Sequence, residues 1–331
     1  MRKLLILNSL ATSAFLKLGM IKMSYEFTKI KVKGENGYGE DIPIGANAIN
    51  IKYNNETVKS ALDRIKDITG RWETDGAGMH NSHYRGKYLG STITETQINA
   101  INEGSFNDLY IGDYWTLPVT KHDNTEVSVN FRIAHFDYFY GRGDTKCTTH
   151  HIVLVPDQVI YSDSMNSNNN VTGAYVGSLM KTEKMDNTIT AFENALTAAS
   201  SNSVSVLTYR EYFQNAVTNG KPSGGAWFDA GIELMNEAMI AGGGRLMEKI
   251  DNSINNVNIY ALAQEQLKLF DYDITKIMAI DTNNNRVSYW LRNVTSGISF
   301  SDVGSYGSIY DATASNIAGI RPYIPICKNI S

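Results

Sequence analysis

The densest group of reactive side chains is the run CTTHH at positions 147–151. A thiol beside an imidazole can act as a nucleophile with its base, and both groups can bind a metal ion. A metal site needs three or four converging ligands, and adjacent strand residues point to opposite faces, so only one of His150 and His151 can join Cys147. No third residue that would orient such a pair is identifiable. We therefore interpret one histidine as a core residue at the start of the apolar run 151–155.

Carboxylates are a second candidate for chemistry, because glycosidases place two of them on either side of the scissile bond. Acids that could form such a pair are abundant, among them Asp108, Asp113, Asp137 and Asp144. Their spacing does not show whether any two face each other across a cleft. We predict no catalytic residue, and a surface-glycan hydrolase remains an alternative.

Three short motifs favour turns over ligand binding. The run DTNNN at 281–285 supplies the first oxygen positions of a calcium loop, but Arg286 and Arg292 replace the glycine and glutamate that such a loop requires. The run 220–225 lacks the spacing of a phosphate loop and contains a proline. The integrin-type tripeptide at 142–144 is also a good turn. The sequence therefore predicts loops at all three places, and it predicts no metal and no cofactor.

Composition limits the classes of protein to which the chain can belong. Of its 331 residues, 42% are hydrophobic and 19% are charged, and the formal net charge is −4. Ample apolar content with little charge favours a packed core over disorder. A mildly acidic chain does not favour a nucleic-acid partner. The two cysteines cannot form a disulfide framework. The sequence contains no run of about 18 apolar residues, so it predicts no membrane-spanning helix.

The pattern along the chain divides it into four stretches. Residues 1–23 begin like a signal peptide, but their apolar run is short, so we interpret them as a leader or a mis-assigned start. Residues 24–71 read as a small unit of short strands and one helix. Residues 72–83 are rich in glycine and aperiodic, which indicates a linker. Residues 84–331 then form the large domain.

The large domain mixes helices and strands. Helices are expected at 91–103, with Thr92 or Thr94 as the N-cap, at 186–199 and at 229–241. Strand-like runs are expected at 108–117, 127–139, 151–161, 204–209, 267–272, 276–280, 287–291, 307–310 and 320–326. Because the order lacks a regular β-α-β alternation, it predicts an α+β fold and not a doubly wound sheet.

Whole segments of this domain resemble tail, baseplate and fibre proteins of phages that infect Firmicutes. The resemblance spans roughly residues 84–326 and rests on the runs YRGKYLG at 84–90, DLYIGDYW at 108–115, HHIVLVPD at 150–157, GAYVGSLM at 173–180 and LMNE at 234–237. The pair WLRN at 290–293 and GIRP at 319–322 is similar to a signature of domains with the formylglycine-generating, C-type-lectin-like fold. The unit at 24–71 also resembles the attachment modules that precede phage fibre heads.

The resemblance implies a virion protein outside the host cell, with a C-type-lectin-like head at 84–331 that binds a glycan or protein of the bacterial surface. It implies docking to other tail or baseplate proteins and a homotrimer. An expected helix at 57–68 carries an apolar stripe of Val58, Leu62 and Ile65, which we predict to be the trimer seam. The alternatives are a structural baseplate or head-fibre protein without a receptor, and a secreted adhesin.

The resemblance also indicates where ligand contacts would lie. In the related phage domains they are on loops near the C-terminus, which corresponds to residues 293–316. The related oxidases use paired cysteines that this chain lacks, since Cys147 is far in sequence from Cys327, so we expect no enzyme activity. The candidate ligand-binding residues are Trp290, Arg292, Asn293, Ser299, Asp302, Tyr306 and Tyr310.

Overall fold

A computed structural model describes residues 76–243 and 265–330 in full, preceded by the backbones of β1 (Lys29–Gly34), β2 (Gly37–Pro43), β3 (Lys52–Tyr53) and β4 (Glu56–Thr57). The chain divides into two compact units, Met1–Gly70 and Arg71–Ser331. In the first unit, β1 pairs with β2 and β3 with β4, both antiparallel. The expected leader at 1–23 and the side chains of Val58, Leu62 and Ile65 lie outside the described residues.

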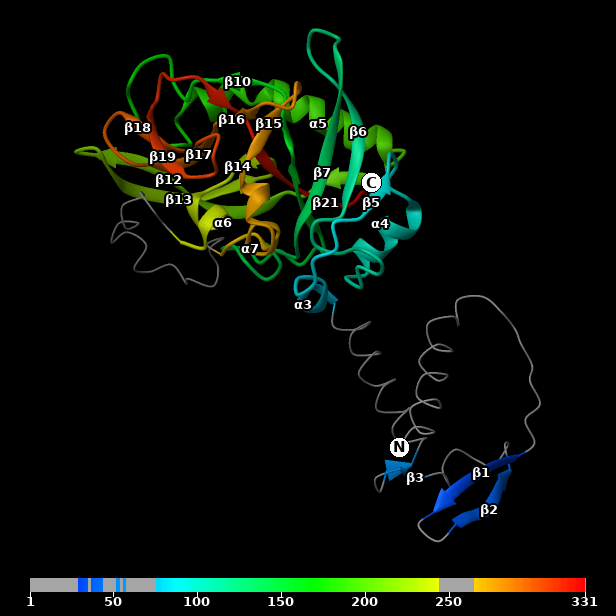
Figure 1. Cartoon of the computed structure of the whole chain (residues 1–331). Helices are drawn as coiled ribbons and strands as arrows, with labels where there is room; N and C mark the ends of the chain where they lie inside the picture. The colour runs from blue at the N-terminus through cyan, green and yellow to red at the C-terminus, as the bar shows by residue number, and fades with distance from the viewer. Residues whose placement is uncertain are drawn as a thin grey trace. The chain divides into compact units, whose positions relative to one another are not determined.

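The core of the second unit is a seven-stranded sheet (Figure 1). Its strands follow the order β11 (Val204–Val206), β21 (Pro322–Lys328), β8 (Ile152–Pro156), β7 (Glu126–Phe136), β6 (Tyr114–Thr120) and β5 (Tyr88–Gly90), with β14 (Glu233–Leu234) paired to β21. All five residues of β8 are buried, and the strand lies in the interior of the sheet between β21 and β7. The larger helix contacts with this sheet are those of α4 (Glu95–Asn102) on β21, α5 (Asp186–Ala199) on β6 and β11, and α7 (Lys268–Tyr272) on β7.

A second sheet has five strands, four of which come from residues 289–319. It has the order β10 (Ser162–Asp163), β20 (Ala318–Gly319), β17 (Tyr289–Val294), β18 (Ser299–Val303) and β19 (Ile309–Thr313), so β19 is an edge strand. A three-stranded sheet joins β9 (Gln158–Val159), β15 (Ala279–Asp281) and β16 (Arg286–Val287). A long hairpin forms from β12 (Tyr209–Thr218) and β13 (Lys221–Ala230). The described part of the chain is therefore mixed α+β, as predicted, and its regular secondary structure is mostly β-strand.

Local signals that fixed helix ends were predicted correctly. Thr94 forms a capping box with Gln97 at the start of α4, as its position suggested. Helix α5 has the predicted bounds. The turn at 281–285 is the hairpin between β15 and β16, and the Asp281 carboxylate accepts hydrogen bonds from the backbone N–H groups of Asn283 and Asn285.

Among the expectations that were wrong, four show how a tertiary or capping contact overrides the local pattern. The helix expected at 229–241 is only α6 (Glu237–Ala241), because Asn236 caps it by accepting from the Met239 N–H, and β13 and β14 occupy the residues before. The strand expected at 267–272 is instead helix α7. The loop expected at 220–225 lies largely within β13. The expected linker at 72–83 includes α3 (Gly76–His80), whose His80 side chain is buried against Phe106 and Phe136.

Candidate functional site

Three of the predicted ligand-binding residues form one row across the second sheet. Trp290 on β17 is paired with Asp302 on β18, and Asp302 is paired with Tyr310 on β19. Residues paired in this way share a face of the sheet and lie within side-chain reach. Trp290 is fully buried, and its Nε1–H donates to the Asp163 backbone oxygen at 2.8 Å. The row therefore leads from a buried indole to an exposed phenol at the sheet edge.

Tyr310 is held as an exposed ring at this edge, with 56% of its surface accessible. The ring lies against Gly304, where an added Cβ would come within 3.0 Å of ring carbons Cδ2 and Cε2. The β18–β19 turn is closed by the Gly304 N–H, which donates to the Ser308 oxygen at 2.9 Å. Tyr306 in the same turn is 82% exposed. The turn and the start of β19 thus present two accessible phenol rings, and backbone hydrogen bonds close the turn.

Asp302 is the unusual member of the row. The residue is only 8% exposed, and its Oδ1 atom is buried without a hydrogen-bond partner among the described residues. Burial, and to a smaller extent the nearby charge of Asp311, raise the pKa of this carboxyl to about 6. Buried carboxylates are normally paired, so an ionised Asp302 is costly in the free protein. We call Asp302, Gly304, Tyr306 and Tyr310 the C-terminal edge site.

The other predicted ligand-binding residues are part of the interior. Arg292 is 7% exposed, forms an ion pair with Glu211 and lies 4.7 Å from the Phe213 ring centroid. The Asn293 Oδ1 atom accepts from the Glu237 backbone N–H at 2.7 Å. Ser299 is 3% exposed. The WLRN segment is therefore a core strand, and no feature of the sequence alone separated its buried residues from the accessible ones in the following turn.

The CTTHH cluster is mainly structural. His151 is fully buried, and its Nε2 accepts from the Phe139 N–H at 3.1 Å while its Nδ1 donates to the Thr149 oxygen at 2.9 Å. This confirms the interpretation of one histidine as a core residue. Burial raises the pKa of the Cys147 thiol, which is opposite to the shift that activates a nucleophilic cysteine.

The second histidine of the cluster, His150, anchors a loop. Its Nδ1 lies 2.7 Å from Asp137 Oδ2, and its ring stacks on Tyr140 with centroids 4.7 Å apart. Asp137 Oδ1 also accepts from the His151 backbone N–H at 2.9 Å. The carboxylate therefore bridges the ring and the backbone at the start of β8.

The acids that could have formed a glycosidase pair are engaged in ion pairs. Arg85 contacts both Asp108 and Asp113, and Arg210 contacts Asp144 at 2.9 Å. The latter pair also ties the integrin-type tripeptide to the protein body. Across residues 76–243 and 265–330, no group of three or more His, Cys, Asp or Glu side chains is arranged to hold a metal ion.

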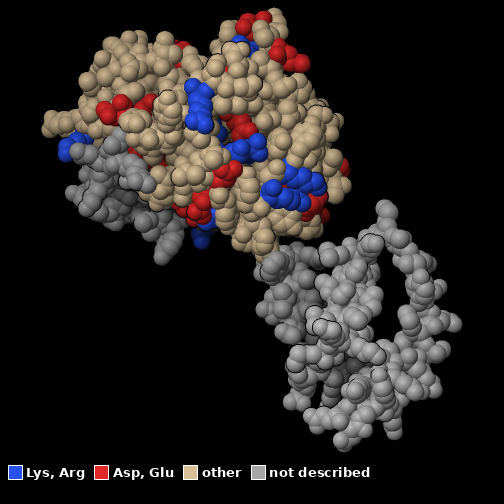
Figure 2. Space-filling view, in the orientation of Figure 1, with Lys and Arg blue, Asp and Glu red and all other residues tan. Residues whose placement is uncertain are grey.

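Two further features bear on the kind of site that the protein could carry: the distribution of charge on its surface and the apolar character of its helices. On the face drawn in Figure 2, acidic and basic side chains are interspersed and form no broad area of one sign. Within the described ranges, none of the helices has the length and apolar character needed to cross a bilayer. The chain matches no protein-family model, no curated protein and no solved structure. The candidate site is therefore argued from its own geometry.

Proposed function

We propose that the chain is a tail-fibre or receptor-binding protein of a phage virion, and that it attaches to the host bacterial surface through the C-terminal edge site. The observation that carries the proposal is Asp302, a nearly buried carboxylate with an unpartnered oxygen beside an exposed tyrosine. The segment resemblance supports the phage context and a C-type-lectin-like head. The proposal includes a homotrimer that docks on other tail or baseplate proteins.

The chemistry of the edge site fits a sugar ring or a short surface peptide. An aromatic ring gives a rigid apolar face with a polar tip, and Tyr310 and Tyr306 offer two such faces. A carboxylate accepts hydrogen bonds from hydroxyl or amide groups, and a ligand would reach Asp302 through the 8% of the residue that is exposed. One shallow contact of this kind is weak, so several copies on one particle would be needed for firm attachment.

A cell-binding experiment tests the proposal. Fluorescently labelled full-length protein is applied to a panel of Firmicutes cells, and bound protein is measured by flow cytometry. We expect saturable binding to at least one strain, and we expect Tyr310→Ala to reduce it about tenfold because the exposed ring is lost.

Tyr88→Ala is the matched control, because Tyr88 is 52% exposed but lies on β5 of the other sheet. It should bind cells like the unmodified protein. Undiminished binding of the Tyr310 variant would place the receptor contact elsewhere. No binding to any strain would favour a structural baseplate or head-fibre role.

A further inference from the structure

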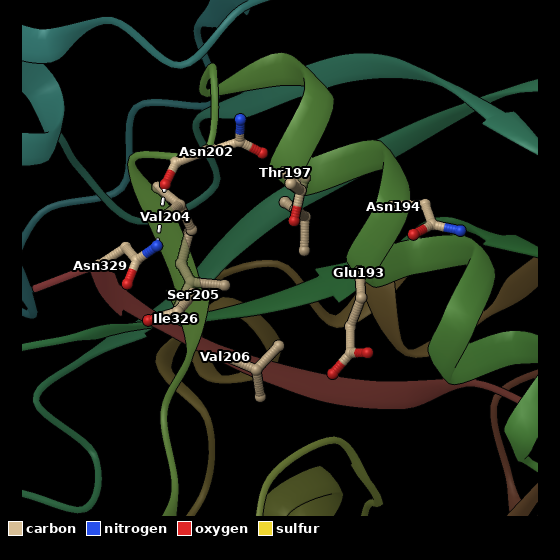
Figure 3. A pocket seen from close by; sticks show the side chains of 10 residues that line it. Glu193, Asn194, Thr197, Asn202, Val204, Ser205, Val206, Ile326 and Asn329 are labelled. Carbon is tan, nitrogen blue, oxygen red and sulfur yellow. Dashed lines mark hydrogen bonds between the residues drawn. The ribbon is translucent and has the colours of Figure 1, made fainter. Parts of the chain in front are cut away.

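A pocket of about 330 Å³ lies between helix α5 and the β11 edge of the seven-stranded sheet (Figure 3). The pocket borders the seven-stranded sheet, whereas strands β18 and β19, which carry the C-terminal edge site, belong to the other sheet. Its volume is at the lower end of the range for small-molecule sites. The lining residues are Glu193, Asn194, Leu196, Thr197, Asn202, Val204, Ser205, Val206, Ile326 and Asn329.

The pocket has an apolar base and polar walls. Leu196, Val204 and Ile326 are at most 5% exposed and form part of the packed core. Glu193 and Thr197 are one helical turn apart, so they lie on the same side of α5. Figure 3 shows the Glu193 side chain extending from the helix toward Val206.

The opposite wall is fixed by backbone contacts. The Asn329 Nδ2 group donates to the Asn202 oxygen at 3.0 Å, and the Asn329 N–H donates to the Ser203 oxygen at 2.9 Å. These bonds tie the segment after β21 to the turn between α5 and β11. The wall is therefore held in place by its own hydrogen bonds.

The pocket lining carries a single negative charge, that of Glu193. Glu193 is the only ionisable residue in the lining, and within the described part of the chain no ion pair or hydrogen bond to its carboxylate is present. Glu193 is an exposed residue at the rim of the pocket, and desolvation by the surrounding protein raises the pKa of its carboxyl above the ordinary value. A ligand that fits must therefore supply hydrogen-bond donors and must not carry a negative charge, since the lining has no cation to meet one.

We propose that this pocket binds a small amine-bearing polyhydroxylated ligand, an amino sugar in the simplest case, with its ammonium group on the Glu193 carboxylate. The sugar hydroxyls would meet the Thr197 hydroxyl and the Asn202 amide, and the apolar ring face would lie over Val206. This site does not depend on the proposed host attachment, because it uses none of the residues of the C-terminal edge site.

Ligand-observed saturation-transfer NMR on the full-length protein tests the inference, with D-glucosamine, D-glucose and glucose 6-phosphate as probes. We expect glucosamine to bind with a millimolar Kd, glucose about tenfold more weakly and glucose 6-phosphate not at all. Glu193→Gln should lower glucosamine affinity to the level of glucose and leave glucose affinity unchanged. Glucosamine affinity of the unmodified protein should also fall as the pH drops through the pKa of Glu193.

Three further variants keep the test decisive. Glu183→Gln, at another exposed glutamate outside the pocket, should change nothing. Val206→Trp should fill the pocket and abolish binding of both sugars while the Tm is retained. Tyr310→Ala should leave glucosamine binding intact, which separates this site from the proposed receptor site. Absence of glucosamine binding at tens of millimolar, or full affinity in the Glu193 variant, would overturn the proposal.

Discussion

Asp302 shows how a single side chain can act against the stability of the fold that holds it. Most buried polar atoms in a folded protein have hydrogen-bond partners, yet Oδ1 of this carboxylate has none among the described residues. The folded-state pKa of about 6 lies above the ordinary value of 3.8, so the folded protein binds the proton more tightly than the unfolded chain does. The ionised form therefore destabilises the fold near neutral pH, and protonation removes that cost as the pH falls below about 6.

Asp302→Asn should for this reason stabilise the protein at pH 7.5 by about 2 kcal/mol. The gain should shrink as the pH falls from about 6 toward 3.8, because the carboxyl of the folded protein is then already protonated, and it should vanish only below the unfolded-state pKa of 3.8. Urea unfolding at pH 7.5 and pH 4.5 measures both values. Asp311→Asn, an exposed neighbour on β19, should change stability by less than about 0.5 kcal/mol.

The Asp302→Asn substitution also distinguishes a role of Asp302 in receptor binding from a role in the stability of the fold. If Asp302 contacts a receptor, the variant will be more stable and will bind cells less well. A variant that is less stable at pH 7.5 would mean that the carboxylate has a favourable partner in the folded protein.

At the level of residues, the sequence could identify the types of side chain suited to ligand contact but not their exposure. Tyr306 and Tyr310 were predicted as ligand contacts within the loop region 293–316, and the structure leaves both accessible. Arg292 and Asn293, from the WLRN run, were predicted as ligand contacts too, but they face Glu211 and Glu237, which are more than 50 residues away in sequence. Partners at such separations are fixed by the packing of the whole domain.

Element boundaries were predictable where the determining contact is local. The Thr94 capping box and the Asp281 turn each involve residues within four positions of each other. The β12–β13 hairpin was missed because its glycines indicate a loop. In the folded protein the Tyr212 ring covers Gly225, where a Cβ would come within 2.4 Å of the ring carbon Cε1. Cross-strand cover of this kind cannot be read from propensity.

The end of helix α4 provides a test at the element scale. Gly104 follows the helix with φ of +68°, and an added Cβ would lie 2.6 Å from the His150 ring. That ring is fixed by Asp137 and by the stacked Tyr140, so it cannot move away freely. Gly104→Ala should destabilise the protein by about 2–4 kcal/mol, from both the backbone conformation and the overlap.

Gly141→Ala isolates the backbone contribution. Gly141 has φ of +75°, but nothing lies within 4 Å of the position of an added Cβ. Its substitution should cost about 1 kcal/mol. Thermal and urea unfolding of both variants give the difference, and equal losses would show that His150 does not pack on the end of α4.

At the scale of the whole molecule, buried ionic groups join segments that are distant in sequence. Arg321 is fully buried and donates to the backbone oxygens of Pro156, Ile277 and Lys276. Glu233 is likewise buried, paired with Lys181 and hydrogen-bonded to Tyr175 at 2.7 Å. These contacts lie within Arg71–Ser331, so the second unit has the internal connections of an independently folding domain.

The division into two units makes the proposed trimer testable. If the apolar stripe of Val58, Leu62 and Ile65 forms the seam, assembly depends on Met1–Gly70 while the fold of Arg71–Ser331 does not. Size exclusion with light scattering should then give three times the chain mass for the full-length protein and a single chain for Arg71–Ser331. The shorter protein should unfold cooperatively at a similar Tm and should bind cells far more weakly, because a single weak contact lacks avidity. A substitution of Leu62 by Glu in the full chain should reproduce the single-chain mass without loss of the folded second unit. A full-length monomer would remove the trimer from the proposal, and a trimer of Arg71–Ser331 would place the seam in the second unit instead.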